Sequence, residues 1–134
     1  MCLPIRRNQK AEIAIEPIVC YKCLTRDMLS PCYRQKYELG KMLTSEISIK
    51  KEFFSHQIEK GFHTYMNKGD ALYASVTFYW HNRVNKNEED QKAPIIIKCE
   101  IPIGATYYKS VSLNTGIGFE YASNQLLPLE IISK

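Results

Sequence analysis

The residue best suited to chemistry is His63, in the segment Gly61-Phe62-His63-Thr64-Tyr65, just before a strand-like pattern gives way to a helical one. A histidine at such a joint can act as a general base, a proton donor or a metal ligand. The alternative is a structural histidine whose ring nitrogens bond to the main chain, and its aromatic neighbours favour that alternative. His56 and His81 are too distant along the chain to form a local pair of ligands with it, so the sequence predicts no metal site.

The five cysteines are the next candidates for chemistry. Cys20 and Cys23 have C-x-x-C spacing, but no second pair follows, and residues three apart in a strand point to opposite faces. Structural packing as inert thiols is therefore the favoured interpretation, with metal or redox chemistry as the alternative. An odd number of cysteines also favours a reducing compartment over a disulfide framework.

The positive charge is concentrated in the first half of the chain. Residues 1–60 contain eleven Lys and Arg against seven acidic residues, whereas the remainder is balanced. Arg34, Lys36 and Lys41 alternate with Tyr33 and Tyr37, which is the composition of a surface that neutralises phosphates and stacks on the bases of single-stranded nucleic acid. The alternative is a solvated hairpin whose aromatic side chains face the core.

The elements that must position these residues are mostly strands. The pattern predicts an N-terminal arm over residues 1–16 and one α+β domain over 17–134, with short twisted strands in one or two small sheets. Residues 18–24 and 94–101 are nearly continuously apolar, which is typical of strands buried on both faces. Further strands are expected at 35–45, 61–66, 105–110, 119–122 and 126–132, and an irregular segment at 46–59.

One substantial helix is expected, over about residues 68–81. Asn67 is a suitable N-cap, and Asp70 places an acid in the first turn. The helix carries a broad apolar stripe that is predicted to pack on the sheet: Leu72, Val76 and Tyr79, with Ala71, Ser75 and Phe78 beside them.

The composition fits a single soluble domain of 134 residues, long enough to bury about two-thirds of its unfolded surface without a metal or disulfide. No apolar run reaches the length of a membrane span, and the N-terminus lacks the apolar centre of a signal peptide. The expectation is a cytoplasmic protein with no membrane partner.

Several short motifs together resemble a group of small uncharacterised proteins of gut bacteria and their phages. They are Tyr37-Glu38-Leu39-Gly40-Lys41, Gly61-Phe62-His63, Ile101-Pro102-x-Gly104-x-x-Tyr107-Tyr108 and Glu120-Tyr121-Ala122-Ser123. The resemblance spans most of the chain and implies no known activity.

A second resemblance covers residues 61–132, whose order of strand, helix, strand ending in Ile-Pro-x-Gly and final hairpin is similar to the second half of mono-ADP-ribosyltransferases. That family binds NAD between two small sheets. The resemblance implies that Tyr21 and Lys22 replace the Arg or His that holds the nucleotide, and that His63-Thr64-Tyr65 replaces the Ser-Thr-Ser strand. Gln125 occupies the position of the catalytic glutamate, so Glu120 would have to supply the negative charge, with His63 or Lys22 near the nucleotide.

Three functions follow as expectations. The first is a non-catalytic module that binds a protein or a small nucleotide-like ligand, without a cofactor, through exposed aromatic residues around Tyr33, Tyr37, Tyr107 and Tyr108. The second is an NAD-using transferase with His63 and Glu120 as catalytic residues. The third is binding of single-stranded nucleic acid. The candidate ligand-binding residues across the first two are Tyr21, Lys22, Tyr65, Tyr107 and Tyr108.

Overall fold

A computed structural model of the chain describes residues 3–6, 9–30, 35–51, 56–74, 76, 94–111 and 118–133. Of these, 57% lie in strands and 8% in helix, so the prediction of a β-rich fold is confirmed. The described strands are β1 Leu3–Ile5, β2 Glu12–Ile13, β3 Ile18–Leu24, β4 Leu43–Thr44, β5 Ser48–Lys51, β6 His56–Lys60, β7 Phe62–Tyr65, β8 Ile95–Ile101, β9 Thr106–Val111, β10 Phe119–Ser123 and β11 Gln125–Ser133.

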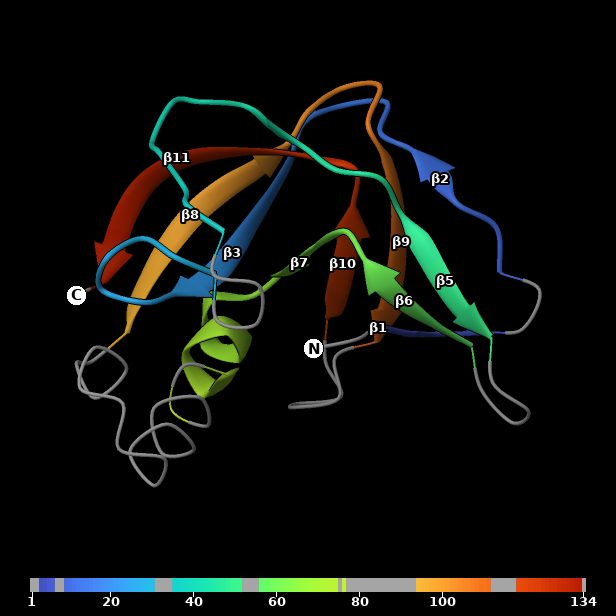
Figure 1. The fold of residues 1–134 in the computed structure, drawn as a ribbon, viewed down its shortest axis with the longest axis horizontal. Coiled ribbons are helices and arrows are strands. Elements are labelled where there is room, and N and C mark those ends of the chain that lie inside the picture. The colour runs from blue at the N-terminus through green and yellow to red at the C-terminus, as the bar shows by residue number, and fades with distance from the viewer. Residues whose placement is uncertain are drawn as a thin grey trace.

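The strands form two antiparallel sheets. The larger has eight strands in the order β2-β9-β10-β7-β3-β8-β11-β4, and the smaller has three in the order β1-β6-β5. The large sheet arches across the molecule, and β1 and β6 lie beneath its β9 and β10 end (Figure 1). Two strands with long apolar runs, β3 and β8, pair along their whole length near the centre of the large sheet, as their sequences predict.

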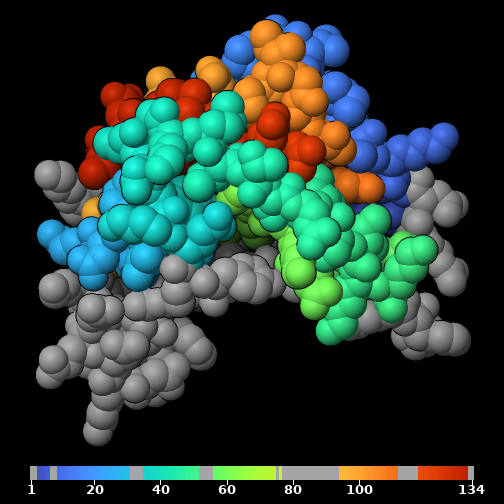
Figure 2. Space-filling model, turned by 45° about the horizontal axis from the view of Figure 1, so that its top comes forward, coloured from blue at the N-terminus to red at the C-terminus, as the bar shows by residue number. Residues whose placement is uncertain are grey.

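The inner face of the arch carries the main hydrophobic core. Alternate residues of β3 and β8 meet there, including Cys20, Leu24, Ile97 and Cys99, all of which are fully buried. The segment of residues 35–47 crosses this face and covers it (Figure 2). Tyr37 of that segment is buried in the core against Phe62, so the expectation that Tyr37 is an exposed binding residue is wrong.

The opposite face of the large sheet has two separate coverings. At one end the helix of residues 68–74 packs Ala71 and Ala74 against Cys23, Tyr65 and Ile96. At the other end the small sheet packs Leu3 and Ile58 against Ala122 of β10. Strands β7 and β10 run between these two coverings (Figure 1).

Three local predictions differ from the structure. The strand expected over residues 35–45 is reduced to β4 at Leu43–Thr44 and an isolated bridge between Leu29 and Lys36, because the chain turns at Gly40, whose φ is +78°. Residues 46–59 were expected to be irregular, yet they contain β5 and most of β6, because pairing with β1 supplies an order that the weak local periodicity does not indicate. The apolar stripe predicted for the helix is confirmed at Ala71, which packs against the sheet, but it is wrong for Leu72 and Val76, which are exposed. Residues 77–81 of the predicted helix, including Tyr79, lie outside the described residues.

The segment predicted as an N-terminal arm contributes β1 to the small sheet and β2 to the large one. The joint between β7 and the helix is held by main-chain bonds, since the N–H groups of Asp70 and Ala71 donate to the Asn67 oxygen at 3.2 and 3.4 Å. Among the described residues, no helix has the length and apolar character needed to cross a membrane.

Candidate functional site

The centre of the candidate site is a hydrogen bond between His63 and Glu120. His63 Nε2 lies 2.8 Å from Glu120 Oε1, although the two residues are 57 positions apart. Their side chains are only 13% and 7% exposed. The structure thus brings together the two residues that the sequence paired only through a resemblance.

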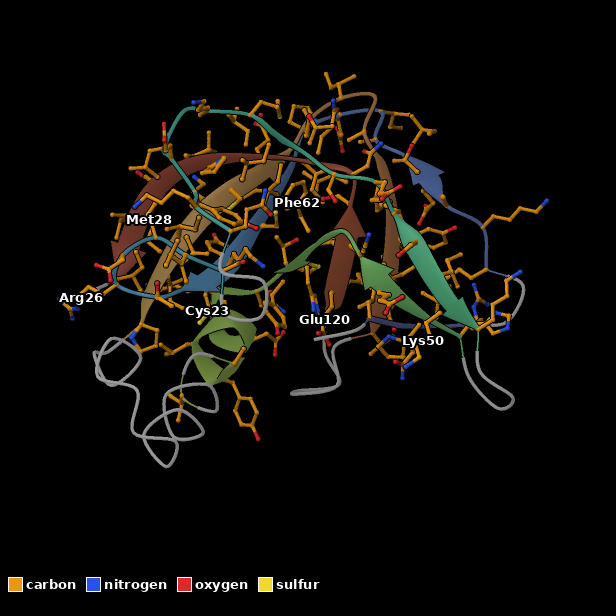
Figure 3. The ribbon with its side chains drawn as sticks, viewed as in Figure 1. Cys23, Arg26, Met28, Lys50, Phe62 and Glu120 are labelled. Atoms are coloured by element: carbon orange, nitrogen blue, oxygen red, sulfur yellow. The ribbon has the colours of Figure 1, made fainter. Side chains whose placement is uncertain are left out.

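The register of the sheet explains why these side chains meet. Strand β7 pairs antiparallel with β10, with His63 opposite Ala122 and Tyr65 opposite Glu120. Paired residues and residues two apart share a face, so all four side chains lie on the face covered by the helix and the small sheet. Figure 3 shows Glu120 below β10 on this side, whereas Phe62 of β7 points to the inner core above.

Two apolar clusters border the pair. Tyr65 belongs to the cluster beneath the helix, and its ring centroid lies 5.1 Å from that of His63 at an interplanar angle of 30°. Ala122 and Tyr108 belong to the cluster beneath the small sheet. Tyr21 is directly opposite Tyr65 and lies on the same face. The His63–Glu120 pair therefore lies between the two hydrophobic clusters.

Two of the predicted ligand-binding residues point the other way. Tyr107 makes an edge contact with Tyr121 on the inner face, with ring centroids 6.0 Å apart. Lys22 is buried on that face as well, with Nζ 5.8 Å from the ring centroid of Tyr37. The site face therefore carries Tyr21, Tyr65 and Tyr108 but neither Lys22 nor Tyr107.

Lys22 nevertheless contacts the site from behind. Its ammonium donates a hydrogen bond of 2.8 Å to the main-chain oxygen of His63. Strands β3 and β7 pair only at Tyr21 and Tyr65 and then diverge. The Lys22 side chain therefore supplies the hydrogen bond to the His63 carbonyl that main-chain pairing with β3 does not supply. This bond holds β7 in place directly behind the imidazole.

The environment of His63 favours the neutral imidazole. Burial lowers the pKa of His63, and the Lys22 ammonium acts in the same direction, while the bond to Glu120 opposes them. When the Glu120 carboxyl is ionised it only accepts hydrogen bonds, and His63 Nε2 then carries the proton and donates to it. Nδ1 then remains as the basic nitrogen of the ring, beside a carboxylate. The site can thus accept hydrogen bonds, and its charge disfavours anions.

The described thiols are not part of this chemistry. Burial raises the pKa of Cys20 to about 12 and that of Cys23 to about 11, and it raises the pKa of Cys99 as well. All three are free, and Cys20 and Cys23 belong to clusters on opposite faces, as their spacing predicts. Thiols held neutral in this way are poor nucleophiles and poor metal ligands at neutral pH.

The predicted nucleic-acid surface is not assembled by the described residues. Arg34 and Tyr33 lie outside them. Lys36 donates to the Asp27 main-chain oxygen at 2.7 Å, Lys41 pairs with Glu38 at 3.7 Å, and Tyr37 is buried. The favoured alternative, with the aromatic ring facing the core, is therefore confirmed for Tyr37.

A further contact fixes the approach to Glu120. Gly118, just before β10, has a φ of +77°, in the region that favours glycine, and a Cβ there would overlap the Asn67 side chain. The Met66 N–H also donates to the Phe119 oxygen at 2.8 Å. The start of β10 and the joint after β7 are thus locked together. This role of Gly118 was not predicted from the sequence, although the motif Gly116-Ile117-Gly118 was an available signal.

Within the described ranges, no group of three or more His, Cys, Asp and Glu side chains could hold a metal ion. Comparisons of the chain with protein-family models, with curated proteins and with solved structures found no match.

Proposed function

We propose that this protein is a non-catalytic module that binds a small nucleoside-like ligand at the His63–Glu120 pair. The observation that carries the proposal is the 2.8 Å bond between these two side chains, almost fully buried between two apolar clusters. Desolvating a carboxylate is costly, and apolar residues of similar volume often replace a buried polar pair without loss of stability. Such pairs occur preferentially at functional sites.

The chemistry of the site selects the kind of ligand. A carboxylate and an imidazole nitrogen accept hydrogen bonds from N–H and O–H groups, such as those of an amino purine or a ribose. Tyr21, Tyr65 and Tyr108 share the face of the pair, and aromatic rings stack on planar bases. Lys22, whose charge would suit a phosphate, lies on the opposite face. A base or ribose is thus favoured over a phosphate as the group recognised.

The test is a calorimetric titration of the protein with adenosine and with NAD, using two matched variants. Glu120→Gln keeps the shape of the side chain but removes its charge, and we expect it to weaken binding at least about tenfold, the loss of one hydrogen bond to a charged group. Glu130→Gln removes an exposed carboxylate of β11 and is expected to bind as the parent does. Binding that Glu120→Gln leaves unchanged, or no heat with either ligand, would contradict the proposal.

A second candidate is an NAD-using transferase or glycohydrolase. It is favoured by one observation, namely that the structure joins the two residues to which the transferase resemblance assigns catalysis. In that reaction the Glu120 carboxylate would stabilise the positive charge that develops on the ribose as nicotinamide leaves. Release of nicotinamide from the titrated sample, abolished in Glu120→Gln, would favour this candidate over the binding module.

A further inference from the structure

A buried lysine lies behind the His63–Glu120 site, on the opposite face of the large sheet. The Lys22 side chain is only 8% exposed, and its Nζ lies 5.8 Å from the ring centroid of Tyr37 in the main core. Removing an ammonium from water costs free energy even where it gains partners, and apolar side chains of similar volume often replace buried charges without loss of stability. A charge in this place therefore indicates a role beyond packing.

The ladder between β3 and β7 is the place where such a role is needed. These two strands pair at a single position, Tyr21 with Tyr65, whereas β3 pairs with β8 and β7 pairs with β10 along their whole lengths. The candidate site takes side chains from both sides of this short ladder, with Tyr21 on β3 and the His63–Glu120 pair on β7 and β10. The relative position of these side chains thus depends on how β7 is held against β3.

The Lys22 side chain supplies a second connection between the two strands. Its Nζ donates to the main-chain oxygen of His63 at 2.8 Å. Hydrogen bonds from charged donors are shorter and roughly twice as strong as those between neutral groups. The carbonyl and the imidazole belong to one residue, so this bond restrains the main chain from which the ring extends.

We propose that Lys22 is a positioning residue of the binding site: it holds β7 against β3 and so places the His63–Glu120 pair beside Tyr21, a role that rests on the proposed function. Lys22 lies on the face opposite the pair, so it acts on the ligand through His63 and the strand ladder. The long side chain reaches across the gap beyond Tyr21 and Tyr65 where main-chain groups of β3 make no ladder pair with β7.

The charge of Lys22 also acts on the imidazole. Burial lowers the pKa of His63, the bond to the Glu120 carboxylate raises it, and the Lys22 ammonium lowers it again, with a smaller effect in the same direction from the amino terminus. The ammonium on one side of β7 thus opposes the carboxylate on the other. The neutral ring keeps Nδ1 as an acceptor for N–H and O–H groups of the ligand.

The variant Lys22→Met tests this role, because methionine is flexible and apolar and has neither the charge nor the donor. Lys109→Met is the matched control. Its Nζ lies 4.8 Å from the ring centroid of Phe119 on the same face as Lys22, but on β9, two strands away from β7. Both variants remove a lysine that contacts an aromatic ring, and only Lys22→Met removes the bond to His63.

Two measurements separate the variants. In NMR titrations, with the His63 signal identified by its loss in His63→Gln, Lys22→Met should raise the pKa of His63 toward its ordinary value of 6.5, and Lys109→Met should leave it unchanged. In calorimetric titrations with adenosine and NAD at neutral pH, Lys22→Met should weaken binding about tenfold, and Lys109→Met should bind as the parent does. Binding should also be lost at a higher pH in Lys22→Met, because protonation removes the acceptor at Nδ1.

An unchanged pKa of His63 in Lys22→Met overturns the proposal, and so does binding equal to the parent's. Circular dichroism checks the fold of the variant. If Lys22→Met does not fold, Lys22→Gln keeps an N–H donor without the charge, and an unchanged His63 pKa in that variant overturns the proposal as well. A parent that binds neither ligand contradicts the proposed function and this role together, whereas a parent that binds beside an unaffected Lys22→Met contradicts this role alone.

Discussion

Replacing the His63–Glu120 pair with leucines, singly and together, tests whether the pair exists for binding or for stability. The structure fixes the expected magnitudes, because the two side chains are 13% and 7% exposed and share one 2.8 Å hydrogen bond. Glu120→Leu leaves the Nε2–H of a buried imidazole without its acceptor, which costs about 1–3 kcal/mol. His63→Leu removes one hydrogen-bond donor from a buried carboxylate, which costs about 1–3 kcal/mol.

The double variant His63→Leu/Glu120→Leu has neither buried polar group. Its free energy of unfolding is expected within about 1 kcal/mol of the parent's, because well-packed apolar residues commonly replace a buried pair without loss. The single changes would then be non-additive by at least about 1 kcal/mol, as expected for residues in direct contact. Urea unfolding followed by circular dichroism measures all four proteins, with equal m-values as the check on a two-state transition.

Two outcomes would refute this reasoning. If the double variant is destabilised by the sum of the single changes, the residues do not act as a pair. If the double variant retains its stability and still binds adenosine or NAD as the parent does, the pair is not the binding determinant. A stable double variant that has lost ligand binding is the result that agrees with a polar pair retained for function.

Three further predictions concern the parent fold. In urea titrations, Gly118→Ala should lower the free energy of unfolding by about 1 kcal/mol more than Gly40→Ala. Both glycines have φ near +78°, but only the Cβ added at position 118 would meet a neighbouring side chain. Equal losses in the two variants would contradict this contact. The folded pKa of His63 lies below its ordinary value of 6.5, so the unfolded state binds the extra proton as the pH falls through 6.5. The free energy of unfolding should therefore decrease by up to about 1.4 kcal/mol per pH unit below 6.5. His63→Gln should reduce this pH dependence, and an unchanged pH dependence in that variant would contradict the prediction. Alkylation at neutral pH should leave the buried thiols of Cys20, Cys23 and Cys99 unmodified until the protein is unfolded, as measured by mass spectrometry. Rapid modification of these thiols in native buffer would contradict their burial.

The sequence alone predicted the strands whose pattern depends on local chemistry. Residues 18–24 and 95–101 are apolar enough that only a central, doubly covered strand accounts for them, and the spacing of Cys20 and Cys23 placed their thiols on opposite faces. Residues 46–59 do not show such a pattern, because their strands lie in a small sheet of three strands. Their order depends on pairing with β1, some 50 residues earlier by chain position, and not on their own periodicity.

The same division applies to the candidate site. His63 stood out from its residue type and its place before a helix, but a contact with Glu120 could not be read from the chain, because the two are 57 residues apart and meet only through the register of β7 and β10. The sequence could likewise offer Lys22 and Tyr107 as ligand-binding residues, since residue type does not show which face a side chain occupies. The pleat of the folded sheet decided that, because a shift of one residue in a strand moves a side chain to the opposite face.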